Sequence, residues 1–502
     1  MNAFHALRRS RLSPLSACLA AAFATASPHE TLAANLPVTS CLDDGGPGTL
    51  RSVMDAAVDG DVIDLTRLTC STITLTSGVI DTSVFGYHPL DYLTVDGPGR
   101  GALTITANDM SEIFRTGGYE LYGFFTINDL TLAHGGNQYG LPACLWSVHG
   151  TLVLNRVTVT ECHAQTFPDA FAGAYRAGAV KADALTMMDS VITNSSFTAY
   201  YGENAAGGGI YVGGTAVLVG STVSGNSVRS LVANSVFSGA PTAGGGIYST
   251  GNLVVIDSTI SGNTVEATNS GANGVGGGIF VRGSATIVGS TISGNMADGD
   301  GGGMHKPVEH NAVDHGTTLT IQNSTITGNS AGGVGGGLVS ERPTWLANST
   351  IAFNDGAAGG AVMFERSGGY PGAGWLDLQS TIIASNASGS SPPYATDLAT
   401  DDVLTLGGAN NLVMDAATDI ALPPDTLRSD PHLLPLAGNG GSTQTLALAP
   451  DSPAIDAGSN LFGLQVDQRG GAYVRAYGPA PDIGAFERQP APDPIFANGF
   501  EP

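Results

Sequence analysis

The stretch GGGIYVGGTAVLVGSTVSGN, residues 207–226, decides the fold, because the chain repeats its pattern many times. Counted from Ala216, apolar residues occupy positions 0, +2 and +7, and an Asn occupies position +10. Copies that keep the Asn recur every 25 to 37 residues and place it at Asn226, Asn263, Asn295, Asn329, Asn354 and Asn386. Three upstream copies have Gly135, Cys162 and Ser195 in its place. A constant template joined by segments of variable length is typical of a solenoid of stacked repeats.

The template predicts short β-strands. Positions 0 and +2 lie on one face of a strand, whereas +7 is out of phase with a period of two, so a bend must separate two strands. A further strand follows small residues, mostly Gly, and begins at Ile210, Ile247, Ile279, Met304, Leu338 and Val362. Three strands per coil, with neighbouring coils in parallel register, predict an all-β, right-handed parallel β-helix. An inward Asn at each bend would hydrogen-bond to the Asn of the next coil.

The chain is expected to have five parts. These are a signal peptide at 1–26, an N-terminal cap at 38–65, the β-helix at 66–400, an irregular C-terminal cap at 401–488, and a linker and tail at 489–502. In the N-terminal cap, Thr49 is suited to begin a short helix with Leu50, Val53, Met54 and Ala57 on one face. That helix would cover the exposed edge of the first coil.

The first residues resemble a secretory signal. Arg8, Arg9 and Arg11 precede an apolar run, and Ala24-Thr25-Ala26 suits cleavage. Cleavage after Ala34 is an alternative, and Leu15-Ser16-Ala17-Cys18 resembles a bacterial lipobox that would leave Cys18 lipidated.

Four cysteines follow the signal, namely Cys41, Cys70, Cys144 and Cys162. An even number in an exported chain predicts disulfides. Of the three pairings, we prefer Cys41 with Cys70 and Cys144 with Cys162, because each pair is close in sequence and on neighbouring coils.

Charge and hydropathy restrict the partners. The chain has 19 Lys and Arg against 43 Asp and Glu, a net charge of −24, which argues against nucleic acid or an anionic membrane as the partner. The same charge is compatible with cation binding, so Ca²⁺ is the one ion considered. After the signal no run of 18 apolar residues could form a transmembrane helix. We expect a monomer.

Two insertions between a Gly-rich strand and the next template are longer than usual. One follows Met304 and the other follows Val362, while Glu341 and Arg342 lie in the coil between them. Both insertions should project from one corner of the rod and flank a groove for a chain-like ligand. The predicted ligand-binding residues are His305, His310, His315, Arg342, Arg366, Tyr370 and Trp375.

Catalytic and metal-binding interpretations are weaker. A glycosidase needs two acids about 5 to 10 Å apart, for which Glu341 with Glu365 or Glu309 is the best available pair. The three His residues match no common metal motif, so a polar surface loop is the simpler interpretation. Asp298 and Asp300 could bind Ca²⁺, but they lack the repeated Gly-Gly-x-Gly-x-Asp pattern of calcium-binding β-rolls, so a turn is the preferred interpretation.

The C-terminal part carries a group of charged residues, namely Asp456, Asp467, Arg469, Asp482 and Glu487. We expect them to form buried ion pairs and turns that fix the C-terminal cap.

The repeats resemble those of polymorphic outer-membrane and adhesin-like right-handed β-helix proteins, whose architecture is shared by pectate lyases. The resemblance rests on the Gly-Gly-Gly-Ile strands, the Ile-Ser-Gly-Asn bends and the segment that starts at Val38-Thr39-Ser40-Cys41. Residues 430–487, with Ser452-Pro453-Ala454-Ile455-Asp456 and Asp482-Ile483-Gly484-Ala485-Phe486-Glu487, are similar to the choice-of-anchor Q domain. That resemblance implies a surface protein that ends in an anchoring tail, and the final Phe496-Ala497-Asn498-Gly499-Phe500-Glu501 resembles a short tail of secreted proteins in some Gram-negative bacteria. It transfers no catalytic residue.

Three functions remain open. The first is a non-enzymatic, adhesin-like protein that binds a surface or glycan through its loops. The alternative is a polysaccharide lyase or glycoside hydrolase that acts in the groove, and the third is a structural spacer. The fold alone does not decide, because β-helices host binding proteins and enzymes.

Overall fold

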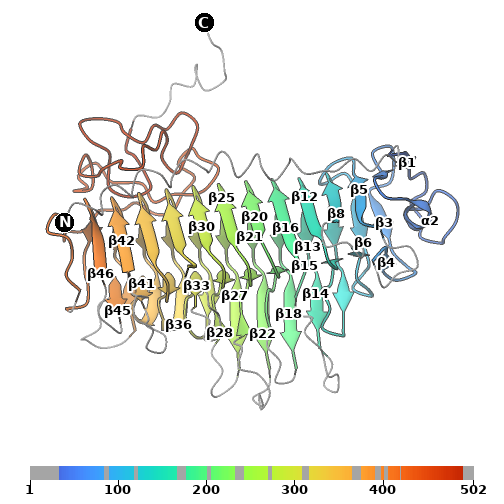
Figure 1. Ribbon diagram of the computed structural model, residues 1–502, viewed down its shortest axis with the longest axis horizontal. Coiled ribbons are helices and arrows are strands. Elements are labelled where there is room, and N and C mark those ends of the chain that lie inside the picture. The colour runs from blue at the N-terminus through green and yellow to red at the C-terminus, as the bar shows by residue number, and fades with distance from the viewer. Residues whose placement is uncertain are drawn as a thin grey trace, which may run out of the picture.

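The protein is a rod of stacked coils, a right-handed parallel β-helix (Figure 1). The computed structural model describes residues 33–83, 90–117, 123–166, 177–200, 205–231, 242–268, 274–307, 316–364, 375–389, 397–400, 405–418 and 420–489. Every pairing between the named strands is parallel, and each strand pairs with its equivalent in the next coil.

Four strands, not three, make up a central coil. Within one coil the chain passes through β20 (Ala216–Val219), β21 (Thr222–Ser224), β22 (Ser227–Ser230) and β24 (Ile247–Ser249). The prediction of three was wrong because the residues after the Asn bend form a strand of their own. We name the four resulting sheets I to IV, in that order along a coil.

Sheet I has 13 strands: β1 (Asn35–Pro37), β2 (Val62–Asp64), β5 (Tyr92–Asp96), β8 (Phe124–Asn128), β12 (Thr151–Asn155), β16 (Ala184–Met188), β20, β25 (Leu253–Ile256), β30 (Ala285–Val288), β34 (Leu319–Gln322), β38 (Thr344–Ala347), β42 (Trp375–Gln379) and β46 (Thr405–Ala409). Sheet II has 12: β3 (Thr72–Thr74), β6 (Thr104–Thr106), β9 (Thr131–Ala133), β13 (Thr158–Thr160), β17 (Val191–Thr193), β21, β26 (Thr259–Ser261), β31 (Thr291–Ser293), β35 (Thr325–Thr327), β39 (Thr350–Ala352), β43 (Ile382–Ala384) and β47 (Leu412–Val413).

Sheet III has nine strands: β10 (Gly136–Asn137), β14 (His163–Gln165), β18 (Ser196–Ala199), β22, β27 (Thr264–Ala267), β32 (Met296–Ala297), β36 (Ser330–Val334), β40 (Asp355–Ala358) and β44 (Ala387–Ser388). Sheet IV has 11: β4 (Ile80–Asp81), β7 (Phe114–Thr116), β11 (Leu145–Ser147), β15 (Val180–Ala182), β19 (Ile210–Val212), β24, β29 (Ile279–Val281), β33 (Met304–Lys306), β37 (Leu338–Ser340), β41 (Val362–Phe364) and β45 (Leu398–Thr400). A separate pair joins β23 (Thr242–Ala243) and β28 (Gly274–Val275).

The apolar template forms the interior. Ala216, Leu218 and Val223 are all fully buried, as are their equivalents in the next coils. Stacking identical positions buries a continuous core that no single coil could form.

The predicted Asn ladder is present. The side chain of Asn263 donates from Nδ2 to Oδ1 of Asn295 at 2.9 Å, and the backbone N–H of Asn263 donates to the same oxygen at 3.0 Å. Equivalent bonds join Asn226 to Asn263, and they continue from Asn295 through Asn329 and Asn354 to Asn386. Each amide also donates to a backbone carbonyl of the preceding coil, as Asn263 does to that of Val223.

A second ladder at the bend between sheets I and II was not predicted. The hydroxyl of Ser258 accepts the backbone N–H of Ser221, and the hydroxyl of Ser290 accepts that of Ser258 at 3.1 Å. These Ser residues are almost fully buried. They satisfy backbone donors that the bend leaves without a strand partner.

The N-terminal cap is built as expected. The helix α2 (Leu50–Ala56) begins after Thr49, whose side chain accepts the backbone N–H of Ser52, and it buries Leu50 and Met54. A strand not foreseen, β1, precedes the cap and pairs with β2.

Both preferred disulfides are confirmed. Cys41 is bonded to Cys70 and Cys144 to Cys162. Next to the first, Arg51 donates to both carboxylate oxygens of Asp43. Burial raises the pKa of Asp43, but hydrogen bonds from Arg51, Ser77 and Thr76 outweigh this and lower it. The disulfide and the ion pair tie the N-terminal cap to the first coils.

The C-terminal segment, residues 431–489, lies along the flank of the rod. Figure 1 shows it, in red, beside the last coils. It packs Leu448, Ile483 and Phe486 against Ile382 and Leu412 of sheet II. The segment therefore covers the outer face of sheet II over several coils.

The expected buried ion pairs hold this segment together. Arg469 pairs with Asp467 at 2.7 Å, and fully buried Arg475 lies 3.4 Å from Glu487. Burial raises the pKa of Glu487 to about 7, although backbone N–H groups of Asp482 and Tyr477 donate to it. The guanidinium of Arg469 also lies over the ring of Tyr473 at 3.8 Å.

Candidate functional site

The predicted groove can be followed only in part. Glu309, His310, His315, Glu365, Arg366 and Tyr370 lie outside the described residues, as do the tips of both insertions. The described members are His305, Glu341, Arg342 and Trp375. The prediction that His305 lies in a projecting loop was wrong, because it is the central residue of β33 and only 7% exposed.

His305 belongs to a column of outward side chains on sheet IV, which we call the sheet IV column. The central residues of successive strands pair in register, so their side chains lie above one another. The column consists of Arg115, Trp146, Lys181, Tyr211, Tyr248, Phe280 and His305. With neighbouring strands about 4.8 Å apart, it extends roughly 29 Å along the rod.

Cations alternate with aromatic rings at the N-terminal end of the column. The guanidinium of Arg115 lies 5.0 Å from the ring of Trp146. The ammonium of Lys181 lies 5.6 Å from Trp146 and 5.4 Å from Tyr211, between the two rings. Such contacts stabilise a positive charge beside an aromatic surface.

Rings stack in the next part. Tyr211 and Tyr248 are 5.1 Å apart and nearly parallel, and Tyr248 and Phe280 are 5.0 Å apart with an angle of 8°. Tyr248 and Phe280 are buried, together with Ala243 and Val275 of the small β23–β28 pair, whereas Tyr211 is part-exposed. The guanidinium of Arg282 lies 5.9 Å from each of the Tyr248 and Phe280 rings.

A charged cluster lies at the C-terminal end of the column. His305 Nε2 is 3.6 Å from Oε1 of Glu341, which belongs to the turn after β37. Neither ring nitrogen of His305 has a hydrogen-bond partner among the described residues. Lys306 is fully buried and donates to the carbonyl of Arg282 at 2.6 Å. Neighbouring coils thus bring an imidazole and a carboxylate together, and the buried Lys306 joins the strand of His305 to the preceding coil.

Arg342, the fourth predicted ligand-binding residue of this region, is 9% exposed. Its Nε has no hydrogen-bond partner in the part of the chain that the structure describes. Trp375 begins β42 rather than lying in a loop, and its ring contacts that of Trp345 edge to face at 4.5 Å. Both Trp residues belong to sheet I, away from the sheet IV column.

Positive charge is concentrated on sheet IV. The chain has only two lysines, Lys181 and Lys306, and both are in this sheet. Arg115 is held by Glu112 at 2.6 Å and Asp81 at 3.3 Å. Burial would lower the pKa of Arg115, but the hydrogen bond and ion pair with Glu112 outweigh this and raise it, so Arg115 stays charged.

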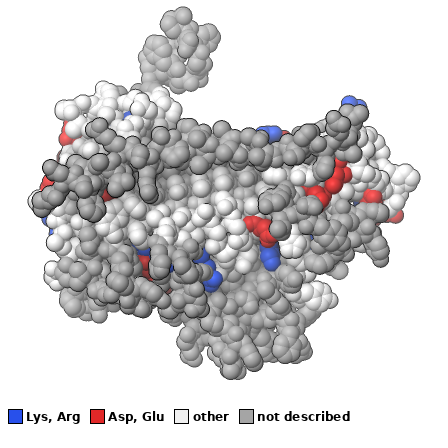
Figure 2. Space-filling view, viewed as in Figure 1, with Lys and Arg blue, Asp and Glu red and all other residues white. Residues whose placement is uncertain are grey.

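The described part of the displayed surface carries little charge. Figure 2 shows that charged side chains on the displayed face form a few small groups, with uncharged surface between them. The part-exposed cations of the sheet IV column are Arg115 and Lys181, in a chain with a net charge of −24.

The two Asp residues considered for Ca²⁺ make structural hydrogen bonds. Asp298 accepts the backbone N–H groups of Ala267 and Gly274, and Asp300 accepts that of Val334 at 2.8 Å. Within the described ranges, no group of three or more His, Cys, Asp or Glu residues is arranged to hold a metal. These contacts account for both Asp residues as turn-forming groups.

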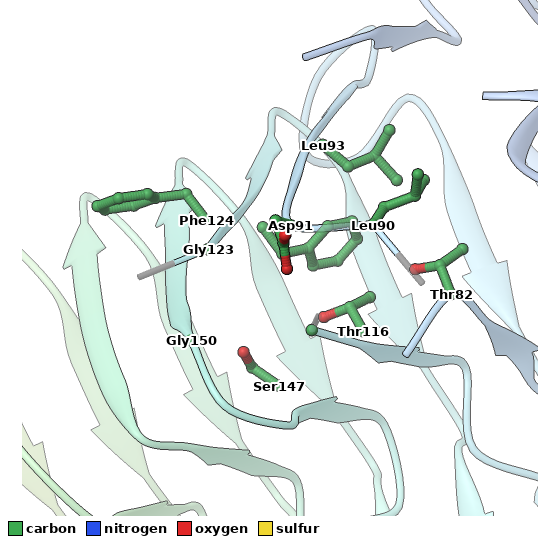
Figure 3. A pocket seen from close by; sticks show the side chains of 11 residues that line it. Thr82, Leu90, Asp91, Leu93, Thr116, Gly123, Phe124, Ser147 and Gly150 are labelled. Carbon is green, nitrogen blue, oxygen red and sulfur yellow. The ribbon is translucent and has the colours of Figure 1, made fainter. Parts of the chain in front are cut away.

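A hollow lies at the corner between sheets IV and I in the first coils (Figure 3). Thr82, Thr116 and Ser147 line it together with Asp91 and Phe124. Its volume of about 220 Å³ includes open solvent and is below the range of about 300 to 1,000 Å³ that is usual for ligand sites. We therefore place the candidate site on sheet IV.

Comparisons with known proteins give one similar structure. No protein-family model matches the chain, and no curated protein matches it. The crystal structure of the pectate lyase Pel9A is similar, with 12% identity, a TM-score of 0.40, and coverage of 91% of this chain and 97% of that one. The fold of this chain is established by its own strand pairing.

The sheet IV column could have been found in the sequence. Each member follows the first apolar residue of a sheet IV strand, as Tyr211 follows Ile210 and Tyr248 follows Ile247. The prediction of ligand-binding residues considered the loop insertions and not this fixed position, so it did not include the column.

Proposed function

We propose that this is an exported polysaccharide-binding protein that holds an acidic glycan chain against sheet IV. The sheet IV column carries the proposal, because its cations and aromatic rings follow one another in register along the rod. Aromatic side chains present an apolar body, and cations attract carboxylate or sulfate groups. A chain-like ligand parallel to the rod axis would meet the part-exposed members of the column, Arg115, Lys181 and Tyr211.

Accessible groups are spread along the column. Arg115, Lys181, Tyr211, Arg282 and Glu341 are part-exposed. The coils that hold Arg115 and Arg282 are five steps apart, which corresponds to about 24 Å. This length fits several sugar units, so binding would be a sum of weak contacts.

Export is supported by the disulfides, which are typical of oxidising compartments. Among the described residues, no helix has the length and apolar character needed to cross a membrane. Attachment to a bacterial outer surface and an adhesin-like role are parts of this proposal that follow from the repeat resemblance.

A second candidate function is cleavage of the bound glycan by a lyase or hydrolase. The observation that favours it is the pairing of His305 with Glu341. A carboxylate beside an imidazole can orient the ring, an arrangement used for proton transfer.

One assay separates the two functions. The mature chain is mixed with polygalacturonate and with neutral dextran, with and without Ca²⁺, and both binding and release of new chain ends are measured. Binding of polygalacturonate without release supports the binding protein. Release that is abolished by His305→Gln and by Glu341→Gln, but not by Phe353→Ala at an exposed position elsewhere, would establish the enzyme. Equal retention of dextran and polygalacturonate would overturn the acidic-glycan proposal.

A further inference from the structure

Sheet II carries a column of threonines on its outer face. The first residue of most of its strands is Thr, and its side chain points away from the buried Ile, Leu or Val that follows. These residues pair in register from coil to coil, with Val191 in one coil. The threonine column consists of Thr72, Thr104, Thr131, Thr158, Thr222, Thr259, Thr291, Thr325 and Thr350.

The C-terminal segment shows what this column binds. Thr291 donates its hydroxyl to the carbonyl of Gln444 at 2.6 Å and accepts the side-chain amide of Gln468 at 3.0 Å. Thr325 donates to the amide oxygen of Gln468, and Thr350 accepts the backbone N–H of Ala485 at 3.0 Å. In each docked coil the threonine hydroxyl therefore bonds to an amide group.

Among the described residues, the other half of the column has the same side chains without that cover. Thr104, Thr131, Thr158, Thr222 and Thr259 are part-exposed, and their hydroxyls bond to none of the described residues. No outward position of the strands from β6 to β26 in sheet II carries a charged side chain. This uncovered half is thus uncharged, regular, and continuous with the surface that already binds amides.

We propose that the uncovered half of the threonine column binds a neutral, N-acetylated β-1,4-linked polysaccharide of the chitin type, lying along the rod. Such a chain carries one amide on every ring, and the coils present one hydroxyl about every 4.8 Å. Successive rings of an extended β-1,4 chain face opposite sides, so the amides on one side recur once per two rings, which is about the separation of alternate coils. The hydroxyl of every second coil can therefore donate to an acetamide oxygen or accept its N–H, as in the docked half. A neutral polymer also avoids repulsion by the net charge of −24.

The test is retention of the mature chain on chitin compared with cellulose, which shares the β-1,4 backbone but has no amide. The triple variant Thr131→Val, Thr158→Val and Thr222→Val removes three hydroxyls while keeping side-chain shape and strand preference. Its matched control changes Thr94, Thr126 and Thr186 to Val, three part-exposed positions on the outer face of sheet I. Unchanged thermal unfolding checks that both variants fold.

We expect preferential retention on chitin, a dissociation constant at least about tenfold higher for the sheet II variant, and no change for the control. A tenfold change corresponds to about 1.4 kcal/mol, a modest loss for three hydrogen bonds. Equal retention on chitin and cellulose, an equal effect of both triple variants, or retention on peptidoglycan but not chitin would each overturn the proposal. Chitin binding should be unaffected by Lys181→Met, which separates this surface from sheet IV.

Discussion

Asn386 donates its side-chain N–H to Oδ1 of Asp397 at 2.8 Å, so the Asn ladder ends on a carboxylate. Asp397 also accepts the backbone N–H of Asn386 on the same oxygen and that of Asp415 on the other. An Asn in place of Asp397 would put its side-chain NH₂ group against one of these N–H donors. A carboxylate, which only accepts, completes the ladder without an unpaired donor.

Asp397 should make stability depend on pH. Burial raises its pKa from about 3.8 to about 6, although hydrogen bonds from Asn386 oppose the shift. Between these values the folded chain holds a proton that the unfolded chain has lost, so the free energy of unfolding falls as pH rises through this window. The change is at most about 3 kcal/mol. Urea unfolding from about pH 4 to pH 8 should show the wild-type advantage over Asp397→Asn decreasing up to about pH 6.5 and constant above it. A pH-independent difference would contradict this origin.

The ladder should be costly to interrupt. Asn295→Ala removes the acceptor of two donors from Asn263 and leaves the carbonyl of Ile260 without its partner. Each buried polar group left unpaired costs about 1–3 kcal/mol, so we expect a loss of at least about 3 kcal/mol in urea unfolding. Asn252→Ala, which removes one exposed bond to Ser284, is the control and should cost less than about 1 kcal/mol. Comparable losses in the two variants would show that the Asn ladder contributes little to the free energy of unfolding.

Close packing of coils should exclude side chains from the Gly-rich strands. A Cβ on Gly245 would meet the backbone carbonyl oxygens of Thr264 and Gly277, so Gly245→Ala forces the coils apart. We expect a loss of about 3 kcal/mol or more, or failure to fold. In Gly438→Ala nothing lies within 4 Å of the new Cβ, and thermal unfolding should be nearly unchanged. Unchanged stability of Gly245→Ala would mean that the coils can separate at little cost in free energy.

The docked C-terminal segment should depend on Gln468. Its side-chain amide donates to Thr291, Thr443 and the carbonyl of Ser290, and its oxygen accepts from Thr325. Gln468→Ala should increase the rate of limited proteolysis within residues 431–489 at least about threefold while the coils stay resistant, since local opening needs less energy than global unfolding. The exposed Gln465→Ala is the control. Equal proteolysis of both variants would show that apolar packing alone holds the segment.

Much of the fold could be predicted from the sequence because the repeat is strict. The inward positions, such as Leu218 and Val223, and the Asn bend constrain each coil so strongly that strand position and register follow. The fourth strand was missed because Ser227 and Val228 follow the Asn in a short run with no signal of its own. The Ser ladder was missed because a Ser at a bend is also an ordinary turn residue.

The candidate site was harder to predict. The proximity of His305 to Glu341 depends on coils 36 residues apart in sequence being neighbours in space, which the template spacing does contain. The burial of His305 does not follow from the sequence, because a His after a Gly-rich segment is equally typical of a loop. The docking of residues 431–489 along sheet II, rather than beyond the last coil, depends on tertiary contacts that no local pattern encodes.

Binding of an acidic glycan by wild-type protein and by the double variant Lys181→Met and Arg282→Met tests the central claim most directly. The change removes two cations from sheet IV, whereas the control Arg229→Met removes an exposed cation from sheet III that pairs with Glu266 at 3.1 Å. We predict that the dissociation constant for polygalacturonate rises at least about tenfold in the double variant, and that added salt weakens wild-type binding. Equal affinity of wild type and double variant, or an equal loss in the control, would contradict binding on sheet IV.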